Sequence, residues 1–149
     1  MNFDMMKYAL VMLLAGFGIP VLAALNAQLG GRISSPPAAA TVLFAVAFVA
    51  SFVAAVTTTG LSPLSQLASQ PIHLFAAGLF IAFYVLTITY VAPHFGVGNA
   101  IMCVLFGQMI AASAIDHFAL FGALVKHLSP LRAGGLSLMA LGIALFQWR

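Results

Sequence analysis

The sequence predicts an all-α membrane protein built from five transmembrane helices. Hydrophobic residues make up 64% of the 149 residues and charged residues only 5%, and the mean hydropathy is +1.17. A soluble domain of this size must present a mostly polar surface to water, so lipid is the solvent that fits this composition. The apolar residues also fall into five stretches, each about long enough to cross a bilayer.

The first predicted span covers residues 6–29 and has two interpretations. The Val-Leu-Ala sequence at 21–23 resembles the cleavage site of a secretory signal peptide. However, the acidic Asp4 is unusual for such a leader, and the glycines before Pro20 interrupt its apolar core. Removal would also leave a less complete bundle, so we expect this segment to be retained.

The other spans are delimited by residues that favour turns or end helices. Their predicted ranges are 38–59, 72–91, 97–115 and 131–148. The breaks are Gly30 to Pro37, Gly60 to Pro71, Pro93 to Gly96 and Lys126 to Pro130. Because each connection is short, neighbouring spans should run antiparallel. Residues 1–149 are therefore predicted to form a single transmembrane domain.

The positive charges give the chain only a weak preference for one orientation. The side that holds the N-terminus receives Lys7, Lys126 and Arg132, and the opposite side receives Arg32 and Arg149. Since the Lys and Arg asymmetry of short loops sets orientation, three against two is a small bias towards a cytoplasmic N-terminus. We expect insertion in both orientations, with a single orientation as the alternative. An inverted copy paired with an upright one would recreate the inverted repeat of many transporters.

Several short sequences, in a fixed order, are similar to those of a known family. They are residues 26–30 (Asn-Ala-Gln-Leu-Gly), 107–108 (Gly-Gln), 116–118 (Asp-His-Phe), 132–135 (Arg-Ala-Gly-Gly) and Gly142. With five spans in this length, the chain resembles the YdcZ-like branch of the drug/metabolite transporter superfamily, whose short members have five spans.

The resemblance implies a transport role and an architecture of five plus five inverted helices, completed by dimerisation. It names no substrate. One departure is the start of the third span, residues 71–74, where Pro-Ile-His-Leu stands in place of the tryptophans expected after the proline.

Polar side chains at membrane depth are candidates for the substrate site, because each costs free energy unless it faces protein or water. Gln108 is the deepest, near the middle of the fourth span, and we expect it to face the bundle interior. It could contact substrate or form an interhelical hydrogen bond. Asn26 and Gln28 could line a vestibule or form a polar exit from the first span, and for Gln28 the polar exit is favoured.

Two further candidates for the substrate site share one face of the third span. Tyr84 and Thr87 are three residues apart, which places them side by side on a helix. Tyr84 could stack on a substrate or hydrogen bond to another helix. Thr87 could instead bond to its own backbone, the commoner arrangement for threonine in lipid.

The first span contains a candidate gate. Gly16, Gly18 and Pro20 lie at membrane depth, and a proline removes the hydrogen bond to the carbonyl four residues earlier, here that of Gly16. We expect a kink at this point, which could be a gate or a static packing bend.

Asp116 and His117 are candidates for coupling transport to protons, because histidine titrates near neutral pH. Their position at the end of the fourth span favours another role. An aspartate at headgroup level stays hydrated, so a structural ion pair with Arg132 or Lys126 is the alternative. The first span has no carboxylate after Asp4, unlike the small multidrug exporters of the same superfamily. A neutral, zwitterionic or anionic solute, or a facilitative mechanism, therefore fits best.

Small residues along the fifth span predict a face through which two copies could dimerise, since such faces let helices approach closely in lipid. Packing within one chain is the alternative, and Gly107, Ala111 and Ala114 offer a second candidate face. The residues of the predicted dimer face are Ala133, Gly135, Ser137, Ala140, Gly142 and Ala144.

The remaining classes of function are not supported by the sequence. The four histidines are dispersed, which argues against a metal site, and no nucleophile motif or cofactor fingerprint indicates an enzyme. The five basic side chains form no patch of the kind that binds nucleic acid. We expect no cofactor and no nucleic-acid partner.

The sequence therefore predicts an inner-membrane transporter protomer that moves a small solute by alternating access. Its expected partners are the bilayer, a small-molecule substrate, and either a second copy in an antiparallel homodimer or a paired homologous subunit. A dual-topology ion channel and an accessory membrane subunit without its own pathway are the alternatives.

Overall fold

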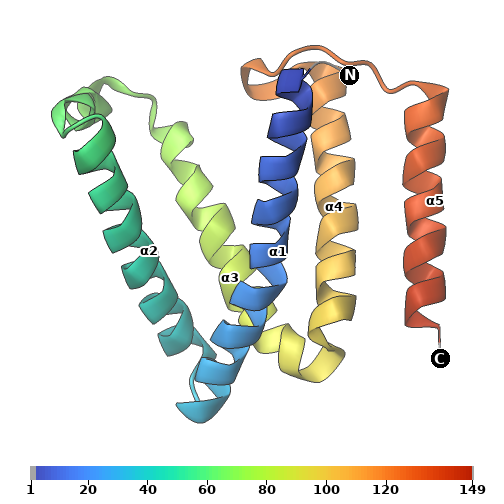
Figure 1. The fold of residues 1–149 in the computed structure, drawn as a ribbon, viewed down its shortest axis with the longest axis horizontal. Helices are drawn as coiled ribbons and strands as arrows, with labels where there is room; N and C mark the ends of the chain where they lie inside the picture. The colour runs from blue at the N-terminus through green and yellow to red at the C-terminus, as the bar shows by residue number, and fades with distance from the viewer. Residues whose placement is uncertain (1–2, 149) are drawn as a thin grey trace. The chain divides into compact units, whose positions relative to one another are not determined.

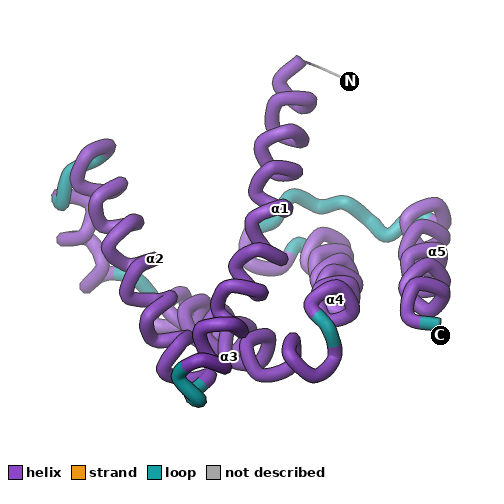
Figure 2. Tube along the Cα trace, turned by 60° about the horizontal axis from the view of Figure 1, so that its bottom comes forward, coloured by secondary structure: helices purple, strands orange, loops and turns teal. Residues whose placement is uncertain are grey.

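The computed structural model describes residues 3–148, and no strand occurs among them. Helices account for nearly all of this range, as Figure 2 shows, and loops are confined to the connections. The five α-helices are α1 (Phe3–Arg32), α2 (Pro36–Thr58), α3 (Ala77–Phe95), α4 (Val97–Phe118) and α5 (Pro130–Gln147). Three short 3₁₀ helices, η1 (Ser62–Ser69), η2 (Ile72–Ala76) and η3 (Leu120–Gly122), lie in the connections.

The predicted all-α class is confirmed, because five helices are long and apolar enough to cross a membrane. Each predicted span lies on one of these helices. The span that contains α3 begins at Ile72, since η2 continues directly into α3. Arg149, which was counted in the charge comparison, lies outside the described residues.

Serine and proline begin two of the helices, as the sequence breaks indicate. The Ser35 hydroxyl accepts a hydrogen bond from the Ala38 amide at the start of α2, and Ser129 accepts one from the Arg132 amide at the start of α5. A proline follows each serine, where its missing amide hydrogen costs nothing. The serines between the predicted spans therefore also cap these two helices.

The chain divides into two compact units, of which the first ends at His94 and the second begins at Phe95. In the first unit α1 packs against α2, and α3 returns to the end of α1 (Figure 1). Its buried residues are Ala23, Asn26 and Gly30 of α1, Ala39 and Ala40 of α2, and Val85, Ile88, Thr89 and Ala92 of α3. The α3 residues are spaced three and four apart and so form one helix face.

Gly30 allows the three helices of the first unit to approach closely. A Cβ atom at this position would lie 3.3 Å from the Pro36 Cα atom and 3.3 Å from the Thr89 methyl group. Both distances are shorter than ordinary van der Waals contacts. A side chain at residue 30 would therefore require α2 and α3 to shift by a few tenths of an ångström from the end of α1.

In the second unit α4 packs against α5 (Figure 1). Half-buried residues of α5 recur every three or four positions and define the side that faces α4. They are Ala133, Leu136, Met139, Ala140, Ile143 and Gln147. The rest of α5 is exposed, so most of its apolar surface remains available to lipid or to another protein.

Candidate functional site

A buried hydrogen-bond relay joins α1 to α3 in the first unit. The Asn26 amide nitrogen donates to the Thr89 hydroxyl oxygen at 2.6 Å, and that hydroxyl donates to the Val85 carbonyl at 2.6 Å. Asn26 is only 4% exposed and Thr89 only 1%. Both side chains are thus held in place deep within this unit.

The hydrogen bonds of Thr89 determine which atom of the Asn26 amide, nitrogen or oxygen, faces α3. A threonine hydroxyl has one hydrogen, and Thr89 uses it on the Val85 carbonyl. Thr89 can therefore only accept from Asn26, which requires the amide nitrogen to point at α3. The Asn26 oxygen is left without a hydrogen-bond partner among the described residues.

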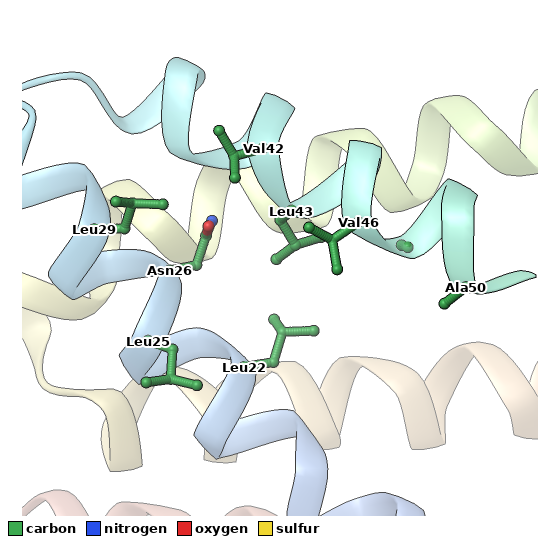
Figure 3. A pocket seen from close by; sticks show the side chains of 9 residues that line it. Leu22, Leu25, Asn26, Leu29, Val42, Leu43, Val46 and Ala50 are labelled. Carbon is green, nitrogen blue, oxygen red and sulfur yellow. The ribbon is translucent and has the colours of Figure 1, made fainter.

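An apolar groove of about 450 Å³ lies between α1 and α2, beside this amide. Figure 3 shows the Asn26 side chain directed from α1 into the space between the two helices. Asn26 is the one residue with a polar side chain in the lining. The others are Leu22, Leu25 and Leu29 of α1 and Val42, Leu43, Val46, Ala47 and Ala50 of α2.

A second cavity, of about 280 Å³, lies between the end of α1 and the end of α3. Thr89, Tyr90 and His94 line it on α3, and Gly30 and Ser34 are among its lining residues from the first part of the chain. The His94 ring nitrogen Nδ1 lies 2.9 Å from the Tyr90 carbonyl. Of the two hydrogen-bonded residues, Asn26 therefore lines the groove and Thr89 lines this second cavity.

Tyr84 and Thr87, the candidates on the third span, have different surroundings. The Tyr84 hydroxyl is buried and has no hydrogen-bond partner among the described residues. Thr87 is exposed, and its hydroxyl donates to the Phe83 carbonyl at 2.6 Å. Neither residue lines the groove beside Asn26.

Gln108 lies near the middle of α4 and is exposed within the described chain. Its amide makes no hydrogen bond to any described residue. Within the second unit, Gln108 therefore lies on an open face of α4.

The candidate gate lies in a continuous part of α1. The helix runs through Pro20 without a break, and a Cβ atom at Gly16 or Gly18 would meet nothing within 4 Å. Residues 4–19 are exposed throughout. The N-terminal half of α1 therefore lacks the packing that holds its C-terminal half.

Asp116 forms the expected ion pair with Arg132, with 3.3 Å between the guanidinium nitrogen and the carboxylate oxygen. The same guanidinium donates to the Lys126 carbonyl at 3.4 Å. His117 accepts a hydrogen bond from the Leu128 amide at its Nδ1 atom, and its ring lies 5.5 Å from that of His127. These contacts tie the α4–α5 connection to the end of α4.

The small residues of the predicted dimer face do not share one environment. Ala133 and Ala140 are half-buried on the α4-facing side of α5. The exposed members, which remain open to other surfaces, are Gly135, Ser137, Gly142 and Ala144. Ser137 donates to the Ala133 carbonyl at 3.1 Å and so satisfies its own hydroxyl within the helix.

Thr89 is the residue of the relay that sequence reasoning missed. A signal was present, because Thr89 is the one polar position on the α3 stripe formed with Val85, Ile88 and Ala92. Among the described residues, no three His, Cys, Asp or Glu side chains lie close enough together to hold a metal ion.

The chain matches one protein family over residues 7–145, the family described as "Putative inner membrane exporter, YdcZ". No curated protein and no solved structure matches the sequence. The matched range contains Asn26, Thr89, Gln108 and the Asp116–Arg132 pair. The five apolar helices agree with a location in the inner membrane. Because the match covers nearly the whole sequence, this chain belongs to the YdcZ branch of the drug/metabolite transporter superfamily.

Proposed function

We propose that this protein is one half of an inner-membrane exporter for a small uncharged solute, and that an inverted copy of the same chain forms the other half. The groove between α1 and α2, with the Asn26 amide at its edge, carries the proposal. It combines an apolar wall with a single polar group, the usual composition of a small-molecule site.

The distribution of charge supports an uncharged solute. The chain has two acidic residues, and both lie near helix ends in ion pairs with basic neighbours. No charged side chain lines the groove. Bringing an ion into such a site would cost several kcal/mol, on the order expected for an unpaired charge in an apolar medium. Exchange of a cation for protons at an embedded carboxylate is therefore less well supported than the movement of a neutral molecule.

Alternating access requires one part of the protomer to move while another stays fixed. The C-terminal half of α1 is held by the Asn26–Thr89 relay and by the close packing at Gly30. The preceding half is exposed and joined to it through Pro20. We assign Gly16, Gly18 and Pro20 to the hinge about which this half of α1 opens and closes the groove.

The proposal of a second copy rests on the exposed amide of Gln108 in α4. An amide in the middle of an apolar helix is stabilised by a polar neighbour, and Gln108 has none among the described residues. A second copy would supply such a neighbour. The exposed small residues of α5 would allow close helix contact, and the weak charge bias would allow the copy to insert inverted.

Flux through the purified chain tests this function. Liposomes that contain only this protein are loaded with radiolabelled chloramphenicol, a neutral aromatic solute with hydroxyl and amide groups, and its efflux is compared with that of the cation ethidium. Saturable chloramphenicol efflux that falls at least tenfold in Asn26→Leu is expected. The matched control is Gln28→Leu, which removes an exposed amide two positions along the same helix.

The same preparation distinguishes the other possible functions. Single-channel currents in a planar bilayer, with no saturable efflux, would indicate an ion channel. Absence of both, together with a second chain that co-purifies from the native membrane, would indicate an accessory subunit. Either outcome would contradict the proposal.

A further inference from the structure

We propose that the groove between α1 and α2 selects solutes that donate a hydrogen bond, because the one polar atom left for a ligand is the Asn26 amide oxygen. This inference rests on the proposed function and narrows its substrate class. The solute is neutral, has an apolar body and carries a hydroxyl or N–H group at one end.

The selectivity originates in the relay behind the groove. Thr89 commits its hydrogen to the Val85 carbonyl, so it accepts from the Asn26 nitrogen and holds that nitrogen against α3. The amide oxygen can only accept hydrogen bonds, and it has no partner among the described residues. A solute that donates would satisfy it, whereas a solute that only accepts would leave it unpaired.

The partial burial of Asn26 makes this unpaired oxygen significant. The residue is 4% exposed, and its oxygen is not among the fully buried atoms without a partner, so it keeps some contact with the space of the groove. A solute that fills the groove excludes water from this oxygen, and an acceptor that is then left unpaired costs roughly 1–3 kcal/mol. The corresponding preference for a donating solute over its non-donating analogue is roughly fivefold to 150-fold, and about tenfold is the central expectation.

The rest of the groove determines the body of the solute. Eight apolar side chains line it around the single amide, and its volume of about 450 Å³ exceeds that of a bicyclic aromatic molecule. A groove of this size lies in the range of about 300–1,000 Å³ typical of small-molecule sites. A lipid acyl chain would fit the apolar wall equally well, but it has no hydrogen to donate to Asn26.

The test compares two ligands of nearly the same shape, 2-naphthol and 2-methoxynaphthalene. The first carries an O–H donor, and the second has the same ring with an oxygen that only accepts. Binding to the full-length protein in nanodiscs is measured by equilibrium dialysis, and uptake by empty nanodiscs of the same lipid is subtracted. We expect saturable binding of 2-naphthol, about tenfold tighter than that of 2-methoxynaphthalene.

Variants distinguish the effect of the Asn26–Thr89 hydrogen bond on ligand preference from general effects on folding. Asn26→Leu should abolish the preference and bring the ratio of dissociation constants close to one. Thr89→Val keeps the amide but releases its orientation, so binding should persist while the preference for 2-naphthol falls. Thr89→Ser, which keeps the hydroxyl, should retain the preference, and so should the control Gln28→Leu. All variants are first compared by size-exclusion chromatography and circular dichroism.

Three results would overturn the inference. They are equal binding of the two ligands to the unmodified protein, an unchanged preference in Asn26→Leu or Thr89→Val, and no saturable binding of either ligand. The last result would mean that lipid or a second copy fills the groove. If the ligand-binding test gives one of these results while chloramphenicol efflux is intact, only the proposed substrate class is rejected. Donor-selective binding with no efflux of any solute would reject the transport function instead.

Discussion

The Asn26 amide nitrogen lies 2.6 Å from the Thr89 hydroxyl oxygen, although the two residues are 63 positions apart in the sequence. This contact joins the first and third helices of one unit through two side chains that are almost completely buried. Asn26 lines the groove that α1 forms with α2, and Thr89 lines the cavity at the end of α3. The same pair therefore serves the packing of the unit and the chemistry of its candidate site.

The Asn26–Thr89 pair should stabilise the fold measurably. Thr89→Val leaves a buried amide nitrogen without its acceptor, so we expect a loss of roughly 1–3 kcal/mol in the free energy of unfolding. Unfolding by SDS in mixed micelles measures this loss. Thr87→Val is the matched control, because Thr87 is exposed and bonds only to the Phe83 carbonyl of its own helix.

The double variant Asn26→Leu with Thr89→Val tests whether the two side chains act as a pair. A coupling of about 0.5–2 kcal/mol is expected, the range seen for interhelical hydrogen bonds in membranes. Additive losses would show that the contact contributes nothing to stability.

Gly30→Ala should destabilise the first unit by about 1–3 kcal/mol, the usual cost of overpacking a close contact. The added Cβ atom would lie 3.3 Å from both the Pro36 Cα atom and the Thr89 methyl group. Gly31→Ala is the control, since a Cβ atom there meets nothing within 4 Å. Equal stability of the two variants, measured by the same SDS titration, would contradict the packing described at the end of α1.

Asp116→Asn should change stability by less than about 1 kcal/mol, because the Asp116 and Arg132 side chains are 34% and 40% exposed and such ion pairs are weak. If Asp116 only ties the α4–α5 connection to α4, chloramphenicol efflux should respond to a pH gradient as in the unmodified protein. Loss of that response in Asp116→Asn, with Arg132→Gln unaffected, would instead assign proton coupling to the carboxylate.

Two histidines should hold their protons on different ring nitrogens. His117 accepts from the Leu128 amide at Nδ1, so this atom carries no hydrogen, whereas His94 faces the Tyr90 carbonyl and must donate from Nδ1. Nitrogen-15 NMR of the imidazole rings at pH 8 reports both tautomers. A hydrogen on Nδ1 of His117 would contradict the contact with Leu128.

The helices could be predicted from the sequence because lipid imposes a simple requirement on each span. Long apolar stretches separated by Gly, Ser and Pro define the five helices, and Ser35 and Ser129 cap two of them. The Asp116–Arg132 pair was also predictable, since both residues lie at the same ends of neighbouring antiparallel helices. These features depend on local sequence and on span order alone.

The relay could not be predicted in the same way, because it depends on how α3 packs on α1. Thr89 satisfies its hydroxyl on its own helix, as most membrane threonines do, and nothing in the sequence shows that it also accepts from Asn26. The expectation that Gln108 faces the bundle interior stays a prediction, because its exposure describes only its surroundings within the described chain. A kink at Pro20 stays a prediction, because Pro20 lies inside α1 and a proline can bend a helix without ending it.

The central claim is that one chain supplies both halves of an inverted dimer, and accessibility of its C-terminal end tests this most directly. A single thiol is introduced as Trp148→Cys, at an exposed position, in a Cys103→Ser background. Intact cells are then labelled with a membrane-impermeant maleimide before and after permeabilisation. Partial labelling that rises to completion after permeabilisation is the predicted result. Labelling that is complete or absent in intact cells would contradict the inverted dimer of identical chains.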